Sequence, residues 1–275
     1  MKAIAPKLYG LEVVETTPDS VTLEAFVNMT NPTPYYATIP YVDINLLVND
    51  TILGHATARN MELHPGNNTG LHVSAVWDPT AGGHSAPGVA RNFISQYVSG
   101  YNTTISVQTH KDTIPFFPQL GAVLSNISID IPTPRLKPPK NPNHGPDDDE
   151  DDGRSHFIQD TTMHLLSSTA TFTLLSPLRK NTLHLTHINA TALWNHTEPV
   201  GFILYDVPFA VPPGASQTPR LPVEWDLLSV GYEAIREALG GSLKLDANAE
   251  VSVRLGNWEE TIWFVGHGIG AKVRP

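Results

Sequence analysis

The chain contains no cysteine, which excludes disulfides, thiolate metal sites and a cysteine nucleophile. It has no run of about 18 apolar residues, so no segment is predicted to span a bilayer. Charged residues make up only 16% of its 275 positions, and no basic face that would bind phosphate groups is visible. We therefore predict no nucleic-acid partner.

The net charge of −10 is concentrated in one place. The segment 147–152 supplies six of the negative charges and leaves only −4 for the rest of the chain. It lies within the proline-rich segment 132–156, whose composition cannot bury enough apolar surface to offset the entropy lost on ordering. We predict a flexible linker there. A calcium loop is rejected, because Glu150 and Gln159 stand where such a loop needs Asp or Asn and Glu.

What the chain does contain is one pattern that occurs twice. A strand-like run, an Asn-X-Thr sequence and a glycine follow one another in the same order in both halves. The copies are 146 residues apart at Asn49 and Asn195, and 147 residues apart at Gly54 and Gly201. The length also suits two domains of roughly 100–150 residues. The pattern therefore predicts a duplicated domain.

Alternating apolar residues predict the strands of both halves. In the first half we expect strands at 21–27, 41–48, 51–58, 71–76, 103–109 and 125–131, with an amphipathic helix at 89–97. In the second half we expect strands at 164–175, 182–194, 201–207, 220–223, 243–255 and 261–265, with a helix at 226–239. The predicted fold class is mostly β, with two tandem β-sandwiches at 1–131 and 157–275, each with one amphipathic helix.

Asn-X-Ser/Thr sequons exceed the roughly two or three expected by chance. They occur at Asn28, Asn49, Asn67, Asn102, Asn126, Asn189 and Asn195. We interpret them as N-glycosylation sites of a chain that faces a lumen or the exterior, the alternative being an abundance of Asn and Thr in β-turns. Residues 1–7 do not form a signal peptide, so we expect an entry signal or membrane anchor upstream of this sequence.

Twelve histidines raise the question of a metal or catalytic site. The closest pair, His184 and His187, falls in one predicted strand, where residues three apart point to opposite faces, so chelation would need a bulge. The other ten are scattered singly, mostly near turns: His55, His64, His72, His84, His110, His144, His156, His164, His196 and His267. We predict solvated histidines and no metal site.

No catalytic motif is found in the sequence. There is no Gly-X-Ser-X-Gly elbow, and Asp43, Asp130 and Asp206 are not spaced as an acid–base pair. The glycines of 266–270 follow a predicted strand, but no helix N-terminus comes after them to receive a phosphate, so we interpret them as the tail of a terminal strand. A hydrolase would need carboxylates and histidine gathered in one cleft. We predict a non-enzymatic protein without a cofactor.

The order of elements, and the sequence Asn31-Pro32-Thr33 before a strand and hairpin, resemble the LEA-type-2 (water-stress and hypersensitive-response) domain. The resemblance is closest to the autophagy-termination-like group of fungal vacuolar-membrane proteins, which carry this domain in tandem on the lumenal side. It implies LEA-2 or fibronectin-III-like sandwiches, a location in the vacuolar lumen or another extracytoplasmic space, and a role in holding or transferring lipid.

A lipid or another apolar ligand would need a groove beneath the predicted helices. The candidate lining residues are Phe93, Ile94, Tyr97, Leu228, Ile235 and Leu239. The same apolar stripes would equally form ordinary core, because a helix needs one to fold onto a sheet. An unfilled interior in the structure would favour ligand binding. A filled one would favour the alternative function, a rigid structural or protein-interaction module.

Overall fold

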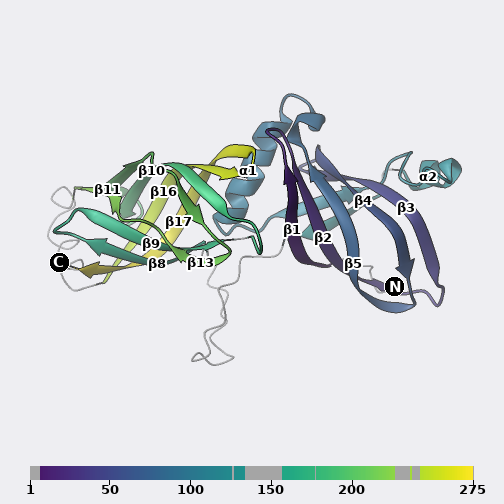
Figure 1. Cartoon of the computed structure of the whole chain (residues 1–275), viewed down its shortest axis with the longest axis horizontal. Coiled ribbons are helices and arrows are strands. Elements are labelled where there is room, and N and C mark those ends of the chain that lie inside the picture. The colour runs from purple at the N-terminus through teal and green to yellow at the C-terminus, as the bar shows by residue number, and fades with distance from the viewer. Residues whose placement is uncertain are drawn as a thin grey trace. The chain divides into compact units, whose positions relative to one another are not determined.

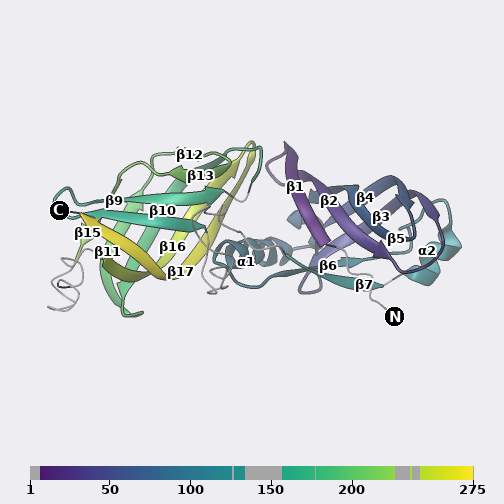
Figure 2. The same ribbon diagram turned by 90° about the horizontal axis from the view of Figure 1, so that it is seen from below.

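The computed structural model describes residues 7–125, 127–133, 157–176, 178–226, 236 and 242–274. The described chain is mostly β, and its strands form two curled sheets (Figure 1, Figure 2). Two compact units are present. The first comprises Met1–Phe93, Asn102–Pro134 and Gly256–Trp258, and the second comprises Ile94–Tyr101, Arg135–Leu255 and Glu259–Pro275. The predicted fold class, two tandem β-sandwich-like domains, is confirmed.

The sheet of the first unit has seven strands in the order β1-β2-β5-β4-β3-β6-β7. They are β1 (Lys7–Thr16), β2 (Val21–Asn31), β3 (Ala37–Val48), β4 (Thr51–Leu63), β5 (Gly66–Trp77), β6 (Thr104–Gln108) and β7 (Ser128–Pro132). Six of them match predicted strands, and β1 was not predicted. Its pairing with β2 shifts register twice, between Leu8 and Gly10 and between Val13 and Glu15. These irregularities break the alternation by which a strand is recognised in a sequence.

The helical elements of this half are η1 (Pro79–Gly82), α1 (Ala86–Val98) and α2 (Pro118–Leu124). The predicted amphipathic helix is confirmed as α1. The short α2 was not predicted, because seven residues are too few to show a helical period and its N-cap, Phe117, makes no side-chain capping bond. The second half of α1 belongs to the second unit, where Ser95 and Ser99 accept hydrogen bonds from the backbone N–H groups of Trp263 and Val265 at 3.0 and 2.9 Å.

The sheet of the second unit has the order β13-β9-β8-β17-β16-β10-β11-β15, with β12 paired to β10 and β14 to β9. Its strands are β8 (Ile158–His164), β9 (Thr169–Ser176), β10 (Leu183–Trp194), β11 (Glu198–Tyr205), β12 (Phe209–Val211), β13 (Gly214–Gln217), β14 (Leu221–Pro222), β15 (Glu224–Trp225), β16 (Ser242–Leu255) and β17 (Trp258–Arg274). Strand β17 pairs with β8 in parallel.

Two predictions for this half are wrong in detail. The single strand expected at 164–175 is two strands, β8 and β9, separated by a turn in which Ser168 has a φ of 46°. The strand expected at 261–265 is the much longer β17, so the glycines of 266–270 lie inside a strand and do not form its tail. Gly268 has a φ of 59°, a local irregularity that glycine tolerates. Of the helix predicted at 226–239, only Asp226 and Arg236 are described, and Arg236 is helical.

The duplicated pattern forms a hairpin in both units, with a connection of two residues in the first and of three residues, Asn195–Thr197, in the second. Asn49 and Asp50 connect β3 to β4 with φ values of 47° and 61°. Asn195 and His196 lie in the connection of β10 to β11 with φ values of 50° and 71°. In a two-residue connection such as that of the first unit, two consecutive positive φ values form the turn whose twist matches that of the flanking strands, and asparagine is favoured in its first position. The second connection begins with the same two positive φ values and has one residue more. The repeat in the sequence is therefore a repeat in the backbone.

Each hairpin also carries an extra residue just before its glycine. Leu46 pairs with Gly54 but Leu47 pairs with Ile52, which leaves Leu53 as a bulge. In the second unit the register shifts in the same way before Gly201 and leaves Val200 as the extra residue. Leu53 and Val200 are both completely buried. The bulge therefore turns one more apolar side chain into the core of each unit.

Each repeat glycine lies opposite a tryptophan on the next strand. Gly54 pairs with Trp77 of β5, and Gly201 pairs with Trp225 of β15. A Cβ atom on Gly54 would lie 1.9 Å from the carbonyl oxygen of Val76, and one on Gly201 would lie 3.0 Å from the Trp225 ring. Only glycine allows the neighbouring strand to approach this closely.

Candidate functional site

The described side chains of the second unit leave a space between them unfilled. This space is a cavity of about 130 Å³ whose walls are almost entirely apolar. The lining comes from several strands and from α1, and includes Val98, Met163, Leu185, Leu245 and Phe264. A cavity of about 150 Å³ in an apolar core is large enough to hold a benzene ring. The second unit therefore has room for one apolar group of that size.

Small side chains on two neighbouring strands leave this space. Ala190 and Ala192 of β10 pair directly with Ala249 and Ala247 of β16, and Ala192 also lies opposite Gly201 of β11. All five line the cavity. Three adjacent strands thus present methyl groups or hydrogen atoms where a packed sandwich would present larger apolar side chains.

The first unit differs at the matching positions. At the offset of 146 residues, Ala190 and Ala192 correspond to Ile44 and Leu46 of β3. Leu46 pairs with the repeat glycine Gly54, as Ala192 pairs with its own repeat glycine. The two copies therefore share the backbone pattern and differ in side-chain volume. The alternation of alanines was visible in the sequence, but only the strand pairing shows that they face one space.

Two polar atoms in the cavity wall have no hydrogen-bond partner among the residues that the structure describes. They are the hydroxyl of Thr161, a residue that is 2% exposed, and the indole N–H of Trp225. A buried donor or acceptor without a partner costs roughly 1–3 kcal/mol. Both atoms would be satisfied by a polar group brought in by a ligand or by a buried water molecule.

Of the six residues predicted to line a groove, the three that the structure describes do not line the cavity. Phe93 is buried in the first unit, with its ring centroid 5.7 Å from that of Trp77. Ile94 and Tyr97 are half-buried, and burial raises the pKa of the Tyr97 hydroxyl. None of these three lines the cavity, whereas Val98, one residue further along α1, does. Leu228, Ile235 and Leu239 lie outside the described residues.

The sequon asparagines are mostly accessible. Asn49, Asn67, Asn102, Asn189 and Asn195 are exposed, Asn28 is half-buried, and Asn126 lies outside the described residues. The side-chain oxygen of Asn28 accepts a hydrogen bond from the Gly70 N–H at 2.9 Å. That of Asn67 accepts one from the Thr30 hydroxyl at 2.9 Å. Asn49 and Asn195 occupy the two repeat hairpin turns.

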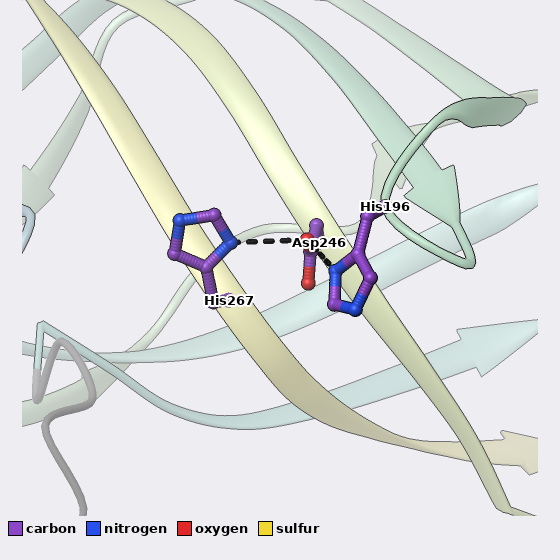
Figure 3. Close-up of side chains that lie close together, drawn as sticks. All are labelled: His196, Asp246 and His267. Carbon is purple, nitrogen blue, oxygen red and sulfur yellow. Dashed lines mark hydrogen bonds and ion pairs between the residues drawn. The ribbon is translucent and has the colours of Figure 1, made fainter.

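A second candidate site is a polar cluster that shares one residue with the cavity wall. Asp246 of β16 lines the cavity and is contacted by two histidines (Figure 3). His196 Nδ1 lies 2.6 Å from Asp246 Oδ2, and His267 Nδ1 lies 3.0 Å from the same oxygen. The three residues come from the β10–β11 turn, β16 and β17, so the fold joins positions that are far apart in the sequence.

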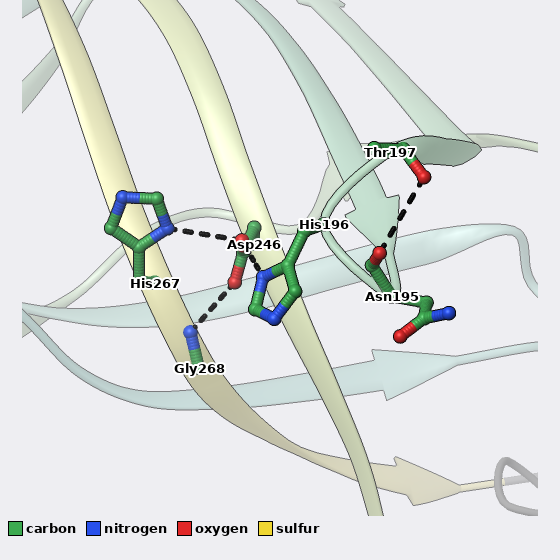
Figure 4. A network of polar contacts seen from close by, with 6 residues as sticks. All are labelled: Asn195, His196, Thr197, Asp246, His267 and Gly268. Carbon is green, nitrogen blue, oxygen red and sulfur yellow. Dashed lines mark hydrogen bonds and ion pairs between the residues drawn. The ribbon is translucent and has the colours of Figure 1, made fainter.

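The surroundings of Asp246 stabilise its charge. Its other oxygen, Oδ1, accepts a hydrogen bond from the Gly268 N–H at 2.8 Å (Figure 4). Burial alone would raise the pKa of this carboxyl group, but the hydrogen bonds from His196, Gly268 and His267, together with the charge of His267, lower the pKa to about 2. The group is therefore a carboxylate at any physiological pH.

The histidines were predicted to be scattered, and the structure changes this picture at two places. His196 and His267 are exposed, yet they converge on one carboxylate. The prediction that His184 and His187 point to opposite faces is wrong, because β10 has a bulge between Leu185 and His187. Leu185 and Ile188 both line the cavity, so the two histidines lie on the outer face. There, His187 Nδ1 lies 2.5 Å from Asp206 Oδ1.

A curled β-sheet unit present twice, each time with a hairpin, a buried bulge residue and a glycine–tryptophan pair, defines a tandem β-sandwich-like protein. Residues 4–122 match the family model described as the Tag1-like fourth LEA-2 like domain. Residues 150–263 match the model described as the Tag1-like fifth LEA-2 like domain. The chain is therefore a tandem LEA-2 domain protein. A search of curated proteins found no match.

No helix within the described ranges has both the length and the apolar character needed to cross a bilayer.

Proposed function

We propose that the second unit binds an apolar ligand, with the end of a lipid acyl chain in its cavity, and that the tandem pair holds or transfers this ligand without catalysis. The observation that carries the proposal is the unfilled interior framed by Ala190, Ala192, Ala247, Ala249 and Gly201. Each methylene group buried there would contribute about 0.8 kcal/mol. The cavity volume suits a short terminal stretch of the chain and not a whole lipid.

The two unpartnered polar atoms in the wall support a ligand that is not purely hydrocarbon. The Thr161 hydroxyl and the Trp225 indole N–H can each bond an ester, carboxyl or hydroxyl oxygen. An acyl chain carries such an oxygen only at its carboxyl end, so the short stretch held in the cavity would be that end. The ligand would thereby satisfy the two polar groups and place its first methylene groups against the alanines.

The proposed setting is the lumenal side of a fungal vacuole-type membrane or another extracytoplasmic space, with N-glycans on the sequons. Support comes from the exposure of five sequon asparagines and from the match to Tag1-like domains. The non-enzymatic role is supported by the LEA-2 match, since such domains are generally non-catalytic. Expression in a secreting yeast, followed by removal of N-glycans, should lower the mass, and an unchanged mass would contradict glycosylation.

The ligand proposal is tested by filling the cavity with the side chains of the other repeat. In the double variant Ala190→Ile/Ala192→Leu, these positions carry the residues that the first unit has at Ile44 and Leu46. Protein purified from yeast would be extracted, and the lipids that remain bound would be measured by mass spectrometry. We expect stoichiometric lipid with the unchanged chain and at least a tenfold loss with the variant.

The matched control is Ala210→Leu, which enlarges an exposed alanine of β12. It should retain the full amount of lipid. Circular dichroism would establish that both variants are folded. Equal lipid in the filled variant and the control, or no lipid in the unchanged chain above that of an unrelated sandwich protein, would overturn the proposal.

A protein-interaction module is the second candidate function, and one observation favours it. Beside α2, the aromatic side chains of Phe116 and Phe117 are 69% and 56% exposed, and Val123 is 79% exposed. Exposed apolar clusters of this kind are typical of interaction surfaces. If Phe116→Ser/Phe117→Ser abolishes the function of the protein in cells while the filled-cavity variant Ala190→Ile/Ala192→Leu retains it, the structural or protein-interaction role is the correct one.

A further inference from the structure

We propose that His196, Asp246 and His267 form a binding site for a divalent transition-metal ion, with Zn²⁺ as the best-suited ion. The site lies in the second unit and shares Asp246 with the cavity wall, but the proposal does not rest on the apolar ligand proposed above. Its two imidazole rings approach the same carboxylate oxygen from the hairpin turn and from β17 (Figure 3).

The candidate ligand atoms of the three residues lie nearly as close together as the ligands of a bound zinc ion. One ligand atom from each of the three residues can be chosen so that all lie within 4.8 Å of one another. Bond lengths of about 2.0–2.2 Å to zinc place two ligand atoms of a tetrahedral site roughly 3.4 Å apart. The present nitrogen–oxygen distances of 2.6 and 3.0 Å therefore need to open by less than about 1 Å to admit the ion.

The exposure of the three side chains allows this movement and provides an entry path. The side chains of His196 and His267 are 76% and 64% exposed, whereas that of Asp246 is 7% exposed. The anchored ligand is thus the carboxylate, and the mobile ligands are the two rings at the surface. The ion would approach from solvent and replace the two histidine–carboxylate hydrogen bonds.

The backbone around the site supplies the outer support that metal ligands require. The Gly268 N–H holds Asp246 Oδ1 at 2.8 Å and leaves Oδ2 directed to the histidines (Figure 4). A hydrogen bond to the second oxygen of a ligating carboxylate fixes its orientation and raises affinity. His196 has a φ of 71°, and this left-handed turn conformation brings its ring over the carboxylate.

The donor set selects the class of ion. Two imidazole nitrogens and one carboxylate oxygen suit Zn²⁺, Cu²⁺, Ni²⁺ and Co²⁺, whereas Ca²⁺ and Mg²⁺ require mainly oxygen ligands. Three protein ligands would leave at least one coordination position for water. A neutral histidine would bind through Nδ1 by moving its proton to Nε2, and a protonated one would release a proton to the solvent.

The test is a zinc titration of the full chain, purified without a polyhistidine tag and stripped with a chelator. Competition with a chromophoric zinc chelator would give stoichiometry and affinity. We expect one equivalent of Zn²⁺ bound by the unchanged chain, and a loss of affinity of at least tenfold in both His196→Gln and His267→Gln. These exposed positions tolerate substitution, and unchanged circular dichroism would establish the fold. Tetrahedral Co²⁺ absorption in the visible should appear in the unchanged chain and disappear in both variants.

Two further variants distinguish this site from adventitious binding by the other histidines. Asp246→Asn keeps the shape of the side chain and should lower affinity at least tenfold, whereas His84→Ala removes an exposed histidine of the first unit and should leave affinity unchanged. If the double variant His196→Gln/His267→Gln binds one equivalent as tightly as the unchanged chain, or if the unchanged chain binds none at about 100 µM Zn²⁺, the proposal is wrong.

Discussion

The backbone N–H of Asp226 donates a hydrogen bond to the carbonyl oxygen of Val200 at 2.9 Å. The first unit has the same bond at 2.8 Å, from the Asp78 N–H to the carbonyl oxygen of Leu53. In both cases the acceptor is the buried bulge residue and the donor follows the tryptophan that lies opposite the repeat glycine. The structural repeat thus extends from the hairpin turn to a Trp-Asp pair at the end of the strand that lies beside the repeat glycine, β5 in the first unit and β15 in the second.

This close approach predicts that replacing the repeat glycine of the first unit, Gly54, lowers stability. A Cβ atom in Gly54→Ala would meet the Val76 carbonyl oxygen at 1.9 Å, which is backbone and cannot move without separating β4 from β5. We expect the free energy of unfolding to fall by about 1–3 kcal/mol, measured by urea denaturation. Gly88→Ala is the control, because nothing lies within 4 Å of its added Cβ in α1. It should be neutral or stabilising by up to about 1 kcal/mol.

The hairpin turn of the first unit can be improved. Asp50 has a φ of 61°, which costs energy for any residue with a Cβ atom, and Asn-Gly is the preferred sequence for this turn. We expect Asp50→Gly to raise the free energy of unfolding by about 0.5–1 kcal/mol and Asp50→Ala to leave it unchanged or lower it. Thermal denaturation of the two variants measures the difference. The sequon at Asn49 is kept in both, so glycosylation does not confound the comparison.

Two buried threonines should respond in opposite directions to the same change. Within the described part of the chain the Thr161 hydroxyl has no hydrogen-bond partner, so Thr161→Val should stabilise the ligand-free protein by about 1–2 kcal/mol. The Thr218 hydroxyl accepts a hydrogen bond from the Phe172 N–H at 3.0 Å, so Thr218→Val should destabilise it by about 1–3 kcal/mol. Denaturant titration measures both. A Thr161→Val variant as destabilised as Thr218→Val would mean that the hydroxyl is hydrogen-bonded in solution.

Asp246 makes the stability of the metal-free protein depend on acid pH. Its pKa is about 2 in the folded chain and near 3.9 in an unfolded one, so folding favours the charged form. This contribution is complete above about pH 4 and is lost as the pH falls to 2, with a size of about 2 kcal/mol. The stability of the unchanged chain relative to Asp246→Asn, measured in a chelator, should shrink by that amount between pH 5 and pH 2. A constant difference would contradict the lowered pKa.

The sequence predicted elements whose pattern is local and regular. The alternation of β2 and β4 and the helical stripe of α1 were visible in it, because each follows from the period of its own backbone. The repeat around Asn49 and Asn195 was visible as a repeated sequence pattern. Irregular elements were missed. Bulges interrupt the alternation of β1 and reverse the face of His187 in β10, so a strict period of two gives the wrong result there.

The candidate sites could not be predicted, because both depend on pairing between distant strands. Ala190 and Ala249 are ordinary residues until β10 and β16 place them opposite each other. His196 and His267 are separated by 71 positions and reach one carboxylate only because β16 lies between β10 and β17. A single sequence without aligned relatives contains no signal for such pairings.

The exchange of Ile44 and Leu46 for Ala190 and Ala192 has a practical value. The first unit can serve as an internal control for ligand binding. It carries large side chains at the positions where the second unit has alanine, and both units are measured under identical conditions. A ligand that changes the signal of Trp225 in the second unit and not that of Trp77 in the first is therefore bound in the second unit.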